Sequence, residues 1–199
     1  MRIARPVPYR RFALLVVLFF AAAGAIAGQS AAPNKEQADD AAALKKFTLS
    51  VDEYLNLRKA IEKKLPALKN KEELPEMIAA HQQALARKIR EGRPNAKIGD
   101  IFTRDVREAF RHVIQSVFQD PQTAATRSTL QQQKTVRVVP LVVNGIYPDA
   151  VAETTFPSAL LQKLPQLPDE LAYRIVGRDL VLVDSTANLV VDLFYKALP

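Results

Sequence analysis

The stretch LAYRIVGRDLVLVDSTANLVVDLF, residues 171–194, decides the fold. It holds three apolar runs rich in β-branched residues, at 171–176, 179–184 and 188–194. Gly177-Arg178 separates the first two runs, and a three-residue Ser-Thr-Ala segment separates the second from the third. Short polar or glycine-containing breaks between such runs are typical of tight hairpin turns. The stretch therefore predicts a three-stranded antiparallel meander.

The sequence before the meander predicts one more strand and a short helix. Residues 135–144 are β-branched and apolar and lead into an Asn144-Gly145 turn signal. Pro140 within them favours an edge or a break, because proline cannot donate to a strand ladder. Residues 157–164 predict a short helix, followed by a proline-containing link. The C-terminal part is therefore expected to be β-α-β-β-β.

Three amphipathic helices are predicted upstream, over residues 50–65, 72–91 and 103–118. The first begins with Ser50 and Glu53 in the spacing of a capping box. Apolar residues recur at helical spacing in each, so every helix has one face to bury. The three apolar stripes comprise Val51, Tyr54, Leu55, Ile61 and Leu65; Leu74, Met77, Ile78, His81, Leu85 and Ile89; and Val106, Ala109, Phe110, Val113, Ile114 and Val117.

These elements predict an α+β fold, with an N-terminal three-helix layer packed against a small C-terminal β-α-β-β-β antiparallel sheet. A sheet face must be covered, and the helical stripes are the available cover. The expected organisation is a signal peptide at 1–27, a flexible tether at 28–47 with at most a weak helix over 36–46, a helical subdomain at 48–120, a polar linker at 121–133 and an α+β subdomain at 134–199.

The first 27 residues have the three-part pattern of a secretory signal peptide. Four arginines precede an apolar run, 12–23, and the segment ends in the small-residue exit Ala25-Ile26-Ala27. Residues 12–27 number 16, fewer than the roughly 20 that span a hydrocarbon core. We expect cleavage and a periplasmic or secreted mature chain. The alternative is an uncleaved N-terminal membrane anchor.

Charge and cysteine content exclude several classes. The net charge of +7 comes from 28 basic and 21 acidic residues, but four of the basic residues lie in the leader. The remaining signs are interspersed, whereas a nucleic-acid-binding protein concentrates basic residues on one face. Even the densest basic cluster, residues 87–90, is followed directly by Glu91, which favours a solvated surface over anionic-surface binding. The absence of cysteine excludes lipid attachment at the leader, disulfides and thiolate chemistry.

No catalytic motif is present in the sequence. The glycines after the leader are not grouped, so no phosphate-cradling loop is expected. There is no Gly-x-Ser-x-Gly elbow and no His-Glu-x-x-His pair. We therefore expect no catalytic residue, no cofactor and no metal site.

Two groups of residues allow a metal-linked alternative. Asp105, Glu108 and His112 share one side of the third predicted helix, in a spacing that can present metal ligands. That side lies opposite the apolar stripe, so a solvated face is favoured. His81 lies within the second stripe, where a core histidine with one hydrogen bond is favoured over a pH-sensitive group or a ligand contact.

Acidic and aromatic residues of the C-terminal part can each be interpreted as structural or as functional. Asp179, Asp184 and Asp192 mark strand ends, where carboxylates cap turns by accepting backbone N–H groups. A hydrolase would instead need two of them close together in a pocket. Tyr147 and Tyr173 could be exposed anchors for a partner, but a half-buried packing role is the commoner one.

Two stretches are similar to known families. Gly-Asp-Ile-Phe-Thr at 99–103 and the stretch 164–184 resemble a family of exported bacterial proteins of unassigned function. Residues 173–194 resemble the terminal hairpin of RcnB-type periplasmic proteins, which are linked to nickel and cobalt homeostasis. The histidine-rich character of a metal-handling protein is absent, because the chain has two histidines. No functional residue is carried over from either resemblance.

Taken together, the sequence favours an exported periplasmic or cell-envelope protein that is a non-catalytic binding or interaction module with an envelope protein partner. One alternative is a carboxylate-based envelope hydrolase that uses Asp184 and Asp192. Another is a metal-linked envelope protein that uses His81, His112 and nearby acids. Nucleic acid is not an expected partner, and membrane contact is expected only through an uncleaved leader.

Overall fold

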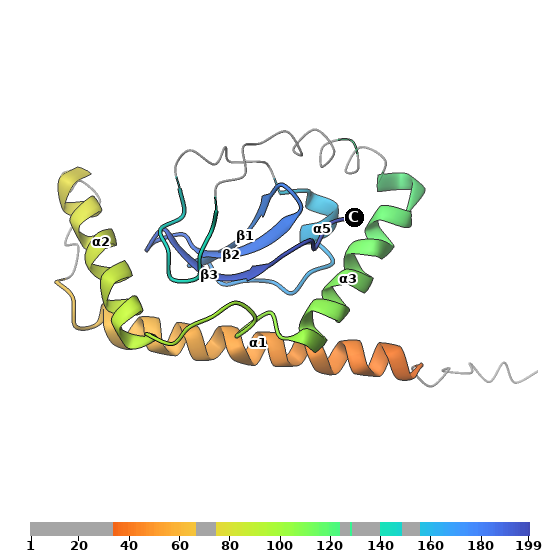
Figure 1. Cartoon of the computed structure of the whole chain (residues 1–199), viewed down its shortest axis with the longest axis horizontal. Helices are drawn as coiled ribbons and strands as arrows, with labels where there is room; N and C mark the ends of the chain where they lie inside the picture. The colour runs from red at the N-terminus through yellow and green to blue at the C-terminus, as the bar shows by residue number, and fades with distance from the viewer. Residues whose placement is uncertain (1–33, 67–74, 124–127, 129–139, 149–155) are drawn as a thin grey trace, which may run out of the picture. The chain divides into compact units, whose positions relative to one another are not determined.

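The computed structural model describes residues 34–66, 75–123, 128, 140–148 and 156–199. Three long helices precede a three-stranded antiparallel sheet, so the predicted α+β class is confirmed (Figure 1). Within the described residues, no helix has both the length and the apolar character needed to cross a membrane. The elements are α1 (Lys35–Glu62), α2 (Pro75–Gly92), α3 (Arg104–Gln119), the 3-10 helix η1 (Pro121–Thr123), α5 (Ser158–Leu161), β1 (Leu171–Val176), β2 (Asp179–Asp184) and β3 (Leu189–Phe194).

The predicted meander is present, with strand order β1-β2-β3. β1 and β2 are joined by a two-residue turn, because Val176 pairs with Asp179. Gly177 has φ +62° at the first position of this turn, a left-handed conformation that glycine adopts without strain. β3 begins at Leu189, one residue later than expected, because Asn188 is itself left-handed with φ +46° and belongs to the turn.

Both faces of the sheet are buried. One face packs against the helices and the other against the segment 140–148, so β3 is buried along its whole length. The helix-side face includes Leu171, Tyr173, Ile175, Leu180, Leu182, Leu189, Val191 and Phe194. The opposite face includes Val176, Val181, Val183, Val190 and Leu193, with Leu141 and Tyr147 from the covering segment.

The segment 140–148 lies along the edge of β3. The Asn144 amide donates to the Val190 carbonyl at 2.8 Å, and the Val190 amide donates to the Gly145 carbonyl at the same distance. These residues form an isolated bridge and a turn rather than the last part of a strand. The first part of the predicted strand, 135–139, falls outside the described residues.

Helix α1 is longer than the sequence pattern predicted. It begins at Lys35 and runs for 28 residues, so Ser50 lies in mid-helix and is not an N-cap. The expectation of a flexible tether over 28–47 is therefore wrong from residue 35 onward. Ala43 and Phe47 are buried and continue the apolar stripe by one helical turn each, so tertiary packing stabilises this part as helix.

Only the second half of the predicted α2 stripe is buried. Leu85 and Ile89 have no exposed surface, whereas Met77 and Ile78 are about half exposed and His81 is intermediate. The last turns of α2 are the part that approaches α1, near Gly92 and its neighbours Leu57 and Ile61. The expected first turn of this helix, at 72–74, lies outside the described residues.

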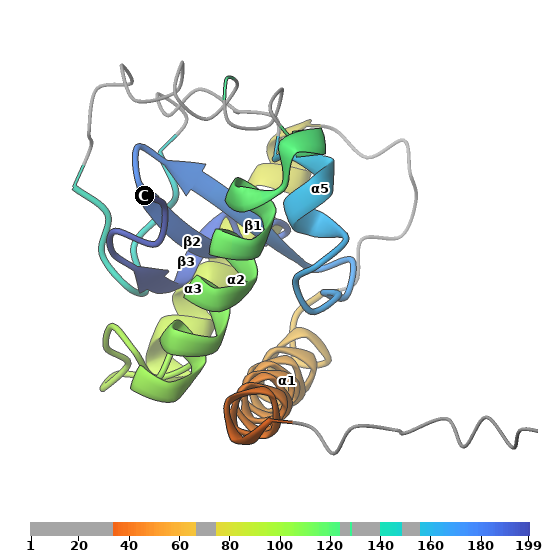
Figure 2. The same ribbon diagram turned by 90° about the vertical axis from the view of Figure 1, so that its right-hand side faces the viewer.

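Helix α3 buries the stripe predicted for it and meets α1 and the sheet in an aromatic core. Phe47 of α1 lies 5.0 Å from Phe110 of α3 and 6.3 Å from Tyr173 of β1, measured between ring centroids. Figures 1 and 2 both place α5 beside α3. The rings of this core are Phe47, Phe102, Phe110, Phe156, Tyr173 and Phe194.

Residues from the predicted helical and α+β subdomains share this hydrophobic core. Contacts within 33–199 make one compact unit. The predicted leader, 1–27, lies outside the described residues. So does the predicted polar linker, 121–133, apart from η1 and Ser128.

Candidate functional site

Asp184 caps a turn, as predicted, and also ties the sheet to α1. Its side chain has no exposed surface, and its Oδ1 accepts the Ala187 amide at 2.7 Å. Its Oδ2 accepts the Tyr54 hydroxyl and the Arg58 Nε, both at 2.9 Å. Arg58 is 2% exposed, and its Nη1 donates to the Glu62 carboxylate at 2.7 Å. The result is a buried ion pair between β2 and α1 that the sequence did not predict.

The charges of this cluster keep its donors protonated. Burial by itself lowers the pKa of the Arg58 guanidinium, but the carboxylates of Asp184 and Glu62 outweigh burial and raise the pKa above its ordinary value. Burial first, and then the Asp184 charge, raise the pKa of the Tyr54 phenol. Both side chains therefore remain hydrogen-bond donors to Asp184 at every physiological pH.

Asp192 ties β3 to the connection between α2 and α3. Its side chain has no exposed surface. Oδ1 accepts the Gly99 amide at 2.9 Å, and Oδ2 accepts the amides of Ile101 and Phe102 at 2.8 and 2.7 Å. Gly99 has φ +92°, a left-handed conformation that lets the chain present its amide in this direction. Asp192 therefore caps a distant loop, not a turn of its own hairpin as predicted.

A β-bulge explains why Asp192 faces the helices. Leu182 pairs with Asp192, but the next residue, Val183, pairs with Val190, so Val191 is an extra residue on β3. Strict alternation would place Asp192 on the same face as Val190, away from the helices. The bulge turns the carboxylate toward the loop that it holds.

The arrangement of these acids does not suit hydrolysis. Asp184 and Asp192 have no solvent-exposed surface, and each carboxylate accepts at least three hydrogen bonds. Asp179 accepts the Lys196 amide at 2.8 Å, outside the core. A general acid or base must come within hydrogen-bond reach of its substrate. These carboxylates act as structural ties.

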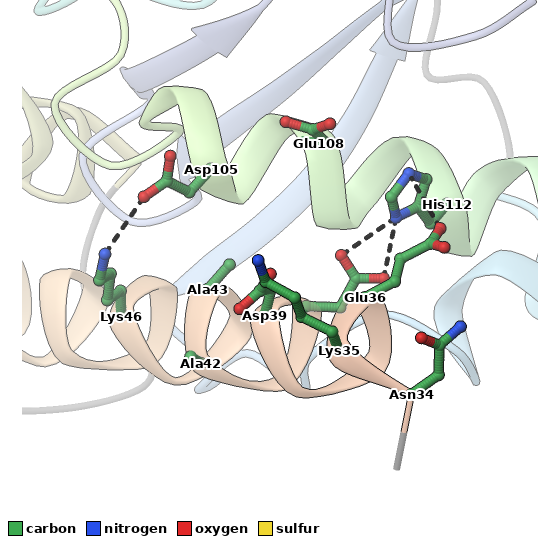
Figure 3. Close-up of a pocket in the computed structure, with 11 residues that line it drawn as sticks. Asn34, Lys35, Glu36, Asp39, Ala42, Ala43, Lys46, Asp105, Glu108 and His112 are labelled. Atoms are coloured by element: carbon green, nitrogen blue, oxygen red, sulfur yellow. Dashed lines mark hydrogen bonds and ion pairs between the residues drawn. The ribbon is translucent and has the colours of Figure 1, made fainter.

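The α3 residues considered as metal ligands lie at a cleft. Asp105, Glu108 and His112 line a cavity of about 580 Å³ together with the first turns of α1. Figure 3 shows Asp105 and His112 reaching toward α1. The side opposite the apolar stripe of α3 is therefore not simply solvated. We call this cavity the α1–α3 cleft, and its lining residues are Asn34, Lys35, Glu36, Asp39, Asp40, Ala42, Ala43, Lys46, Asp105, Glu108 and His112.

Ion pairs join the two walls of the cleft. The His112 Nδ1 lies 2.9 and 3.0 Å from the two carboxylate oxygens of Asp40, and its Nε2 lies 3.6 Å from Glu36 Oε1. The hydrogen bond to Asp40 is the main reason that the pKa of His112 is raised; burial opposes the rise, and the charges of Asp40 and Glu36 add to it. At the other end of the cleft, the Lys46 Nζ lies 3.2 Å from the Asp105 carboxylate.

The cleft carries an excess of negative charge. Five carboxylates and two lysines line it, and within the described residues Asp39 and Glu108 have no ion-pair partner. The acids are distributed along two helices. Among the described residues, no three histidine or acidic side chains converge closely enough to hold a metal ion. The cleft is therefore an elongated acidic surface rather than a compact coordination sphere.

The other predicted candidates have packing roles or lie apart from the cleft. Tyr147 and Tyr173 are buried, and the Tyr173 hydroxyl donates to the Pro165 carbonyl at 3.0 Å, which confirms the packing interpretation. His81 is half-buried on α2 beside the exposed Met77, so it is not the core histidine that was expected.

The α1 side of the cleft was missed by sequence reasoning. Glu36, Asp39 and Asp40 fell in the segment expected to be a tether. The sequence did contain a signal for helix. Ala43 lies four residues before Phe47, and Phe47 lies four residues before the buried Val51, which is helical spacing. No protein-family model, curated protein or solved structure matches the chain. The role of the cleft must therefore be inferred from its own residues and geometry.

Proposed function

We propose that this protein is an exported, non-catalytic binding module of the periplasm or cell envelope, and that its α1–α3 cleft binds an elongated organic cation such as an aliphatic polyamine. The observation that carries the proposal is the charge of the cleft, in which five carboxylates outnumber two lysines and His112, so negative charge is in excess even when the imidazole is protonated. Two of those acids, Asp39 and Glu108, have no ion-pair partner among the described residues. A cation would supply the missing charge.

The size and chemistry of the cleft favour a polyamine over a bare metal ion. A volume of about 580 Å³ is in the range of small-molecule sites. Its acids recur along both helices, which suits amines separated by methylene groups. Ala42 is exposed on the α1 wall, where its short side chain leaves room for those methylene groups.

Calorimetry with spermidine tests the cleft. We expect the wild-type protein to bind spermidine, and Asp39→Asn combined with Glu108→Gln to weaken binding about tenfold, because two unpaired carboxylates lose their charge. The matched control is Asp52→Asn combined with Glu76→Gln, which removes two exposed acids outside the cleft. The control should bind spermidine as the wild type does.

Three outcomes would overturn this assignment. One is the absence of spermidine binding at millimolar concentration. Another is an equal loss of affinity in the two double variants, which would show non-specific attraction to net charge. The third is selective binding of Ni²⁺ that disappears in His112→Gln, which would favour the metal-linked alternative.

The export part of the proposal is supported by the first 27 residues. A basic start, an apolar run and the Ala25-Ile26-Ala27 exit together predict cleavage after Ala27. When the full chain is produced in a bacterium with two membranes, N-terminal sequencing of the periplasmic fraction should begin at Gly28. Ala27→Leu should block processing, because the cleavage site requires a small residue, whereas Ala22→Leu should not. An unprocessed wild-type chain in the cytoplasm would contradict export.

A further inference from the structure

The first two turns of α1 are held to the rest of the protein mainly by polar contacts. Residues 35–42 are exposed, except for Asp40, which is partly buried, and the first buried apolar residue is Ala43. Among the described residues, the ion pairs that join these turns to α3 are those of Asp40 and Glu36 with His112. Helix ends with little apolar burial open readily. The ion pairs of His112 therefore contribute to the stability of this end.

The groups that face His112 are acidic. Glu36 and Asp40 approach it from α1, and Glu108 lies one turn earlier on α3. The guanidinium of the neighbouring Arg111 lies over the Phe194 ring, 5.0 Å from its centroid. The cations of α1 that line the cleft are Lys35 and Lys46, and Lys46 is paired with Asp105.

We propose that His112 is a pH-dependent latch, which holds the first two turns of α1 against α3 more tightly when protonated than when neutral. The protonated ring binds Asp40 through Nδ1 and attracts Glu36 through Nε2. The neutral ring keeps at most the hydrogen bond. The latch also sets how much of the Asp40 and Glu36 charge is available inside the cleft.

The direction of the pH dependence follows from the raised pKa of His112. The stabilisation is complete below the ordinary histidine value of 6.5 and is lost as the pH rises through the folded-state value above it. A second consequence rests on the proposed cation site. Protonated His112 competes with a cation for Asp40 and Glu36, so a polyamine that bridges the acids of α1 and α3 should replace the lost ion pairs and bind more tightly as the pH rises.

Hydrogen exchange of the ligand-free protein tests the latch independently of cation binding. Protection factors, corrected for the intrinsic effect of pH, should fall about threefold for amides in 38–43 between pH about 5.5 and about 8.5. His112→Gln should remove this dependence. His81→Gln is the matched control, because it changes the other of the two histidines and should retain the dependence.

A titration by NMR gives a second measurement. The midpoint of the His112 imidazole should fall in Asp40→Asn, because the charged partner is replaced by a neutral amide. Equal protection of 38–43 at both pH values, or an unchanged dependence in His112→Gln, would overturn the latch. If the latch is observed but spermidine does not bind, only the proposed function fails. If spermidine binds but the protection of residues 38–43 does not depend on pH, only the latch fails.

Discussion

Asp192→Ala is expected to lower the free energy of unfolding by about 3–5 kcal/mol, the largest effect of any single substitution considered for this protein. The carboxylate has no exposed surface and accepts the amides of Gly99, Ile101 and Phe102 at 2.7–2.9 Å. Alanine supplies no acceptor, so these amides of the loop before α3 lose their partner. Each buried unsatisfied donor costs about 1–3 kcal/mol. Urea denaturation monitored by far-UV circular dichroism measures the change in unfolding free energy.

Two further variants, one at the same position and one in the same loop, separate the loss of the acceptor from other effects of substitution. Asp192→Asn keeps one acceptor oxygen, but its NH₂ group places donors against the amides of the loop. Its loss of unfolding free energy should be smaller than that of Asp192→Ala but still above about 1 kcal/mol, the cost of about one unsatisfied donor. Asp100→Asn is the control in the same loop, because its carboxylate is exposed and accepts, among the described residues, the Lys97 amide alone. Its effect should stay within about 0.5 kcal/mol. Equal stability of the Asp192 and Asp100 variants would contradict the tie.

The sequence could predict the hairpins but not the partners of their acids. Asp192 lies within an otherwise apolar run and Asp184 ends one, and a charge that is buried at such a position needs partners. The partners lie far away in the chain: Arg58 is 126 residues from Asp184, and Phe102 is 90 residues from Asp192. The bulge that turns Asp192 toward the helices depends on strand register, which alternation alone does not reveal.

The α1–α3 cleft was half predictable for a different reason. The three- and four-residue spacings of Asp105, Glu108 and His112 place them on one side of α3 from sequence alone. The opposite wall was assigned to a tether, because a capping-box pattern at Ser50 resembled a helix start. That local pattern was overridden by the burial of Phe47, which extends the helix toward its N-terminus. Local propensity is a weak guide where tertiary packing decides the boundary.

Arg58→Met is expected to cost about 3 kcal/mol, because it leaves the Asp184 charge buried without its cationic partner. Methionine preserves much of the apolar length of the side chain, so the loss reports on the guanidinium more than on packing. The Nε contact to Asp184 is 2.9 Å, and the two side chains are 3% and 0% exposed. Glu62→Gln is the control, since that carboxylate pairs with the same guanidinium but is 40% exposed. Its cost should be below about 1 kcal/mol.

A double-mutant cycle separates the interaction energy of the Arg58–Asp184 pair from the cost of burying each charge. Asp184→Asn alone leaves the guanidinium without a buried counter-charge, and Arg58→Met alone leaves the carboxylate without one. Each single variant therefore carries a penalty that the double variant avoids. The double variant should lose about 1–3 kcal/mol less than the two single losses added together. Additive losses would mean that Arg58 and Asp184 do not interact in solution, and α1 would then be held to the sheet by its apolar stripe and by the Tyr54 hydroxyl.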